Sequence, residues 1–143
     1  MQDLPNPAQL LAAVARFLRE DAGPALARHG DNALAYQARV AANMVDTVAR
    51  QTTLGPAADA AEQRRLQALL GLPADHPDAT DLAALNHRLA SRIADGALSS
   101  NHPGLADHLW ATTLAKLAVD QPGYDTFQRH DGSPTAHHPT GTP

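Results

Sequence analysis

Apolar residues recur at helical spacing along the first 121 residues, and glycine and proline separate one run from the next. Leu10, Val14, Phe17 and Leu18 have the spacing of one apolar helix face, and Leu85 and Leu89 repeat it further along the chain. Thirty of the 143 residues are alanine, the best helix former, whereas aromatic residues make up 3%. A sheet protein of this length would need more β-branched and aromatic residues. The sequence therefore predicts an all-α fold.

The stop signals divide this pattern into a compact bundle of about five helices, largely antiparallel between neighbours. Asn6 has the character of an N-cap, and Pro7 suits the first helical position. The Gly-Pro pairs at 23–24 and 55–56 are expected to end one helix and begin another segment. The expected helices are 6–21, 33–51, 57–71, 81–96 and 105–121, with a short turn or helix over 24–32. They form a predicted single domain over residues 1–124, followed by a disordered polar tail, rich in proline and histidine, over 125–143.

Composition excludes several classes of function. The chain has no cysteine, so disulfides and thiolate chemistry are ruled out. Its net charge is −4, with scattered basic residues, which argues against nucleic acid as a partner. The first ten residues lack the features of a signal peptide, and no apolar run is long enough to span a membrane. We expect a cytoplasmic protein that binds neither nucleic acid nor membranes.

Catalytic and metal-binding patterns are also missing from the sequence. No two histidines stand four residues apart, and no HExxH motif occurs, so we expect no metal and no cofactor. The serines and glycines form neither a nucleophile arrangement nor a phosphate-binding loop. His108 lies at helical spacing from Thr112 and is interpreted as a partly exposed helix residue rather than a proton carrier. These features favour a protein that is not an enzyme.

Lys116, the single lysine of the chain, and Asp120 are the first candidate site residues. On a helix they align with Leu105 and Leu109, which predicts a charged pair on an apolar face. The pair is either a structural ion pair or an anion contact, since buried charges require partners in both cases. Asn86 borders the apolar stripe of the fourth helix, and either Asn86 or Arg39 is expected to bond to this pair.

Arg39 and Asn43 form a second candidate set, because they share a polar stripe with Asp46 and Arg50. One interpretation is a solvated helix face stabilised by the pair of Asp46 and Arg50. The other is that the stripe lines an internal pocket or a subunit interface. The sequence leaves both interpretations open.

Several segments resemble a small bacterial helical family of unknown function. The most characteristic are "RVAAN" at 39–43, "LN" at 85–86 and "KLAVDQPGY" at 116–124. This family is usually encoded beside aminoglycoside-phosphotransferase-like kinases and acyl-CoA dehydrogenases. The resemblance implies one of these two enzymes as a protein partner, and it implies no activity.

Two functions follow from this reading. The first is a non-catalytic accessory protein that works with the phosphotransferase-like kinase or the acyl-CoA dehydrogenase, with a homo-oligomer as an open alternative. The second is a protein that binds an anionic acyl or phosphoryl compound, or an enzyme acting on one, in a helix-lined pocket. Arg39, Asn86, Lys116 and Asp120 would be the ligand contacts in that case. A pocket that encloses three of these four side chains would favour the second function.

Overall fold

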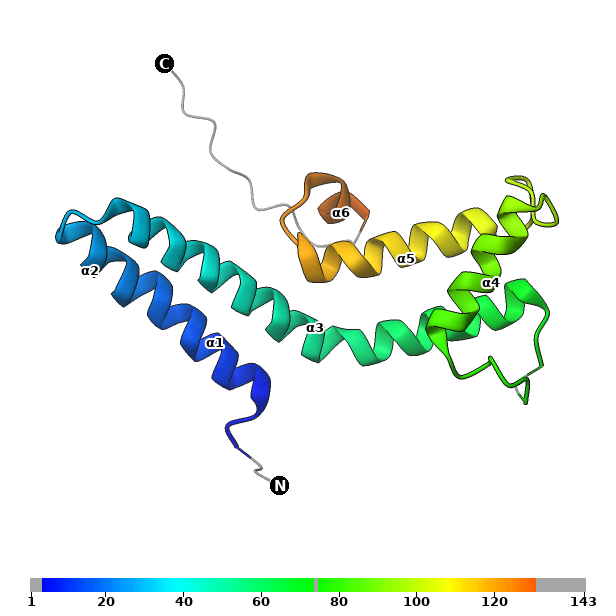
Figure 1. Ribbon diagram of the computed structural model, residues 1–143, viewed down its shortest axis with the longest axis horizontal. Helices are drawn as coiled ribbons and strands as arrows, with labels where there is room; N and C mark the ends of the chain where they lie inside the picture. Colours follow the sequence, from blue (N-terminus) through cyan, green and yellow to red (C-terminus); the bar gives the residue numbers. More distant parts are fainter. Residues whose placement is uncertain (1–3, 74, 131–143) are drawn as a thin grey trace, which may run out of the picture. The chain divides into compact units, whose positions relative to one another are not determined.

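The computed structural model describes residues 4–73 and 75–130, and every regular element within them is helical (Figure 1). The prediction of an all-α fold is confirmed. In chain order the elements are α1 (Pro7–Phe17), the π-helical turn η1 (Leu18–Ala22), α2 (Gly23–Arg28), α3 (Asn32–Leu70), α4 (Leu82–Ala94), α5 (Leu105–Asp120) and α6 (Asp125–His130).

The chain divides into two compact units between Asp59 and Ala60, and the long helix α3 contributes residues to both. Unit 1 comprises residues 1–59 and unit 2 residues 60–143. The single domain expected over residues 1–124 stays a prediction. None of the described helices is both long enough and apolar enough to cross a membrane.

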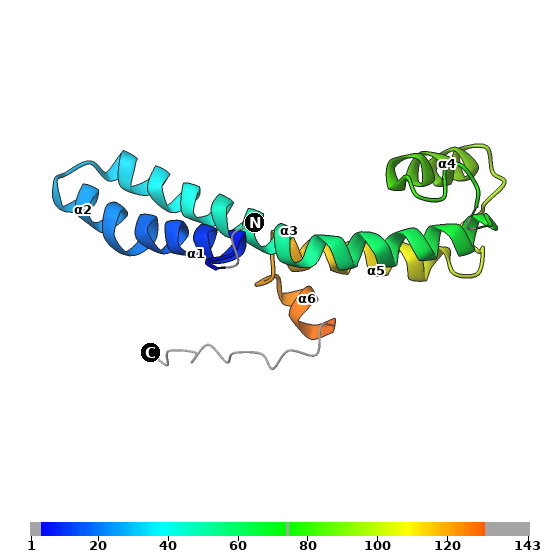
Figure 2. The same cartoon turned by 90° about the horizontal axis from the view of Figure 1, so that it is seen from below.

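Unit 1 is built from α1, η1 and α2, which run antiparallel to the first half of α3 (Figure 2). Asn6 caps α1 as expected. Its side chain accepts a hydrogen bond from the Gln9 amide at 2.9 Å, and its own amide donates to Gln9 Oε1 at 2.9 Å. This capping box satisfies two amides at the start of the helix that have no partner within it. A turn that contains Gly30, at φ 86°, then reverses the chain into α3.

Both Gly-Pro pairs lie inside continuous helical segments, so the predicted stops at 23–24 and 55–56 are wrong. The residue before a proline usually avoids the helical region because its Cβ meets the proline ring, and glycine has no Cβ. Before Pro24, the chain adds a π-turn in which the Gly23 amide donates to the carbonyl of Leu18. At Gly55, a Cβ would lie 2.5 Å from Gln51 Nε2, so the Gln51 side chain occupies the space that glycine leaves.

The interior of unit 1 consists of small residues. Those classed as buried in this unit are Ala15, Gly23, Ala35, Ala42 and Gly55. A Cβ on Gly23 would lie 3.1 Å from the Leu18 carbonyl oxygen and 3.7 Å from that of Ala35 in α3. A methyl group would already be in contact with α3 and would crowd the Leu18 carbonyl of η1, so a larger side chain has no room at this point.

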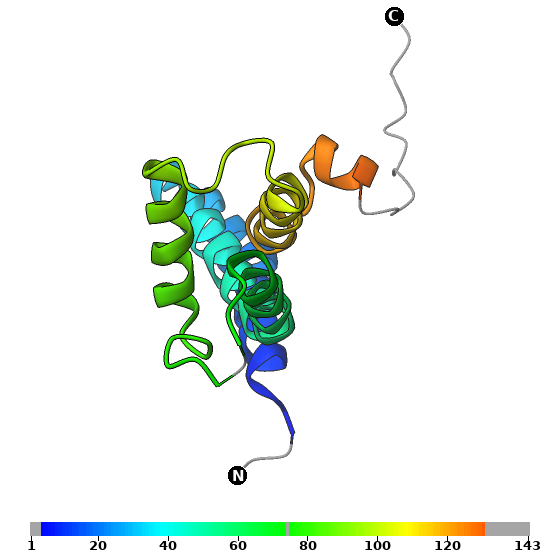
Figure 3. The same cartoon turned by 90° about the vertical axis from the view of Figure 1, so that its right-hand side faces the viewer.

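Unit 2 has a leucine core. Leu66 and Leu70 of α3 pack with Leu85 and Leu89 of α4 and with Leu105 of α5. In unit 2, α4 and α5 lie on different sides of the second half of α3 (Figure 3). Six buried leucines in all form this cluster, including Leu98 from the segment between α4 and α5. Side chains of this size supply about 1.5–3 kcal/mol each on burial, more than alanine supplies in unit 1.

Helix α6 occupies residues 125–130, where the sequence predicts the start of a disordered tail. That prediction is wrong for these six residues, and 131–143 lie outside the described residues. Phe127 is buried, Asp125 pairs with Arg129, and the His130 ring meets the edge of Trp110 of α5 at 5.0 Å between centroids. The buried phenyl ring supplies an apolar anchor that a purely polar tail would lack.

We predict that Gly23→Val lowers the free energy of unfolding by about 2 kcal/mol, because the new side chain meets backbone oxygens that cannot move away easily. Gly123→Val is the matched control, since nothing lies within 4 Å of a Cβ at that position. Urea unfolding followed by far-ultraviolet circular dichroism measures both. Equal effects of the two substitutions would contradict the close packing described for unit 1.

Candidate functional site

The residues predicted to form a site fall into two groups. Arg39 and Asn43 belong to unit 1, whereas Asn86, Lys116 and Asp120 belong to unit 2. The sequence predicts that Lys116 and Asp120 contact either Asn86 or Arg39. The contacts within each unit show which partners these residues have.

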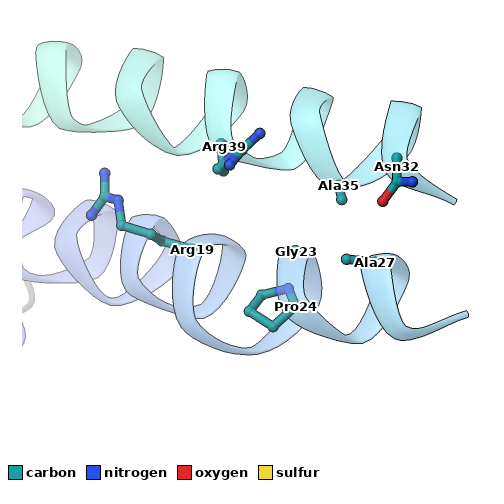
Figure 4. A pocket seen from close by; sticks show the side chains of 7 residues that line it. All are labelled: Arg19, Gly23, Pro24, Ala27, Asn32, Ala35 and Arg39. Atoms are coloured by element: carbon teal, nitrogen blue, oxygen red, sulfur yellow. The ribbon is translucent and has the colours of Figure 1, made fainter. Parts of the chain in front are cut away.

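Arg39 lines a groove of about 550 Å³ in unit 1. Figure 4 shows Arg19 and Arg39 on the two facing helical segments. Gly23, Ala27 and Ala35 lie further along the gap between these segments. Asn32 and Pro24 complete the lining of this unit 1 groove. The Arg39 guanidinium lies over the ring of Tyr36, 5.9 Å from its centroid, which suits a cation–π contact.

The polar stripe of α3 bonds across to η1. Arg19 Nη2 donates to Asp46 Oδ2 at 2.5 Å and to Asn43 Oδ1 at 3.3 Å. Asp46 therefore pairs with Arg19, whereas the solvated-face interpretation paired it with Arg50. Because the groups remain partly exposed, this ion pair contributes little to stability and mainly sets the register of the two segments. Sequence reasoning missed Arg19, since no local pattern links residues 27 positions apart.

Three large apolar side chains of α1 lie outside the interior of unit 1. Leu10, Val14 and Phe17 are exposed by 48%, 50% and 57%. They share one face of α1, here called the α1 stripe. The face that is buried or half-buried passes instead through Leu11, Ala15 and the other residues at the same spacing, Ala8, Leu18 and Ala22. The buried face of α1 is therefore rotated about the helix axis relative to the face that the sequence predicts.

Lys116 and Asp120 are exposed, so the prediction of a charged pair on the inner face of α5 is wrong. Neither side chain forms an ion pair with any residue in the described part of the chain. The inner face passes through Leu105, His108 and Val119, while Leu109 is turned outward. Exposing one leucine costs less than burying two charges, which explains this orientation of the helix.

Asn86 finds its partners elsewhere in unit 2. Its Nδ2 donates to Glu62 Oε1 of α3 at 2.8 Å and to the Leu82 carbonyl at 3.1 Å. The prediction that this amide requires hydrogen bonds is confirmed, but neither Lys116 nor Asp120 provides them. Asn86 therefore connects α4 to α3 beside the leucine core.

A pocket of about 350 Å³, whose accessible lining is mostly apolar, lies close by in unit 2, between α3 and the start of α5. Four polar residues line it, Arg65, His102, Asp107 and His108, together with Ala68, Leu69, Pro103 and Gly104. Arg65 Nη2 donates to Thr112 Oγ1 at 3.3 Å, which joins the two helices. We call this feature the polar pocket, after its four polar residues. None of the five predicted site residues lines it.

His108 is 3% exposed, which contradicts its interpretation as a partly exposed residue. Burial lowers its pKa below the ordinary value of 6.5, and the nearby Arg65 charge lowers the pKa further, while Glu62 acts in the opposite direction. The folded protein therefore favours the neutral imidazole. No three histidine, aspartate or glutamate side chains among the described residues are placed to hold a metal ion.

The lowered pKa of His108 predicts that stability falls as the solution is acidified. Below pH 6.5 the unfolded chain takes up a proton at this residue while the folded chain resists it, so stability is lost as pH falls toward the folded-state pKa. Urea unfolding of His108→Gln should show a smaller loss than the wild type between neutral and mildly acidic pH. His87→Gln, at an exposed position, is the control, and an NMR titration of the His108 ring checks the direction independently. An unchanged pH slope in His108→Gln would refute this assignment.

Comparison with known proteins gives one match. A family model described as a domain of unknown function (DUF6285) matches residues 28–124, more than half of the chain. The matched range includes α3 to α5, the polar pocket and all five predicted site residues, whereas α1 and η1 precede it. No curated protein and no solved structure matches the chain.

Proposed function

We propose that this chain, which belongs to the DUF6285 family, acts without catalysis by docking onto a partner protein through the α1 stripe. One observation carries the proposal. In unit 1 the buried residues are alanines and glycines, whereas Leu10, Val14 and Phe17 face outward. The unit thus leaves outside the side chains that usually stabilise a helical pair.

The spacing of the α1 stripe suits recognition of a helix by a groove. Anchors at positions i, i+4 and i+7 point to one side of a helix, and grooves on partner proteins commonly accept such a row. Burying a side chain of this size contributes about 1.5–3 kcal/mol, so three of them can supply much of a binding free energy. Single exposed apolar residues are common on protein surfaces, but a row of three on one helix face marks an interaction site.

The phosphotransferase-like kinase or the acyl-CoA dehydrogenase, expected from the family resemblance, is the proposed partner. The alternative was a ligand site formed by Arg39, Asn86, Lys116 and Asp120. Neither the unit 1 groove nor the polar pocket encloses three of these side chains: the groove includes Arg39 alone. This distribution supports the accessory role over that alternative.

Co-purification with the two candidate enzymes tests the proposal. The triple variant Leu10→Gln, Val14→Gln and Phe17→Gln should lose at least about tenfold in affinity, because it removes all three anchors while keeping the helix. The control is Ile93→Gln with Leu109→Gln, which alters two exposed apolar residues of unit 2.

Two results would contradict docking by the α1 stripe. One is equal recovery of partner protein with the triple variant and with the control. The other is a wild-type oligomer that becomes monomeric in the triple variant while neither enzyme binds, because the stripe would then contact a second copy of this chain. Mass spectrometry of the purified material and analytical ultracentrifugation distinguish these outcomes.

A further inference from the structure

The polar pocket of unit 2 contains a cation without a carboxylate partner. No carboxylate oxygen of the described residues lies within 4.0 Å of the Arg65 guanidinium, although Asp107 lines the same pocket. Within the described part of the chain, the guanidinium donates to a neutral hydroxyl, that of Thr112, and its buried Nε has no acceptor. A partly buried guanidinium with an unused donor is costly unless an anion compensates it.

Two histidines that line the same pocket also have a ring nitrogen without a partner. His108 Nδ1 and His102 Nδ1 are both buried without a hydrogen bond, and His108 as a whole is 3% exposed. The backbone adds to this set, because Gly104, the N-cap residue of α5, offers no side-chain cap to the first amides of the helix. The first amides of a helix carry a partial positive charge that attracts anions. Three elements thus bring unsatisfied polar groups to one small pocket.

The charges of the pocket select the class of anion. Arg65 supplies one full positive charge, and the neutral form of His108 adds none. Asp107, which is exposed, places a negative charge in the pocket lining and disfavours a doubly charged phosphate. Leu69, Ala68 and Pro103 offer an apolar wall to the rest of the ligand. One cation beside an apolar wall matches an organic monoanion.

We infer that the polar pocket binds a small monocarboxylate whose carboxylate pairs with the Arg65 guanidinium and whose short apolar chain packs against Leu69 and Pro103. The pocket volume of about 350 Å³ suits such a compound. Because Arg65 Nε is buried, the carboxylate pairs first with the terminal nitrogens of the guanidinium, and contact with Nε requires the side chain to rotate. The His108 ring forms a neutral hydrogen-bonding wall. This site is separate from the α1 stripe, so the two proposals can fail independently.

Butyrate is the test ligand, added to the full-length protein at constant ionic strength. The Nε–H signals of arginine and the ring signals of histidine report binding in NMR spectra. Butyrate should shift the Arg65 and His108 signals in a saturable manner, whereas butylammonium should not, since it repels the guanidinium. Inorganic phosphate should bind at least about tenfold more weakly than butyrate.

Arg65→Gln should weaken butyrate binding at least about tenfold, and Arg64→Gln is the matched control because it removes the neighbouring, exposed arginine of the same helix. Arg65→Lys should also weaken butyrate binding, since lysine keeps the charge but lacks the planar guanidinium. This variant replaces Arg65→Gln in the binding test if Arg65→Gln does not fold. The inference is overturned by an absence of saturable shifts, by equal binding to the Arg65 and Arg64 variants, or by phosphate binding more tightly than butyrate.

Discussion

The contact of Gly23 with the backbone of α3 sets the design of unit 1. A Cβ at this point would already be in contact with the Ala35 carbonyl of α3 and would crowd the Leu18 carbonyl of η1, and the other buried positions include Ala35 and Ala42 of α3. Close approach of two helical segments requires small residues at the contact, and small residues bury little apolar surface. Leu10, Val14 and Phe17 of α1 lie outside this interior. The docking role proposed for unit 1 depends on this arrangement, in which small residues are buried and the α1 stripe is exposed.

The interior of unit 2 is packed with larger side chains than that of unit 1. Its six buried leucines form an interior of large side chains, although Ile93 and Leu109 are exposed. The charged residues Lys116 and Asp120 remain outside. The polar groups that do enter, Asn86 and Glu62, bond to each other. Arg65 and His108 depart from this rule, because each keeps a buried nitrogen without a partner. Such departures from complete pairing are typical of binding sites, which supports the assignment of the polar pocket.

The sequence predicts the helices well and their faces less well. Periodicity identifies α1, α4 and α5, and capping chemistry identifies the start of α1 at Asn6. It cannot decide which of two adjacent stripes is buried when one holds alanines and the other large apolar residues, as in α1. The Gly-Pro pairs mislead for a related reason: a proline costs a helix one hydrogen bond, and strong helix formers on both sides outweigh that loss. The sequence gives no sign that Arg65 belongs to a site, because its contact with Thr112 joins residues 47 positions apart.

Accessibility of single cysteines tests the inverted packing of unit 1 most directly, since the natural chain has no cysteine. Phe17→Cys and Ala42→Cys place a thiol at a 57% exposed and a fully buried position. Reaction with a maleimide should be close to the rate of an unfolded peptide at residue 17, and at least about a hundredfold slower at residue 42, because a buried thiol reacts only when the unit opens. Protection at residue 17, or rapid labelling at residue 42 in folded protein, would contradict an interior of small residues with the large apolar side chains outside.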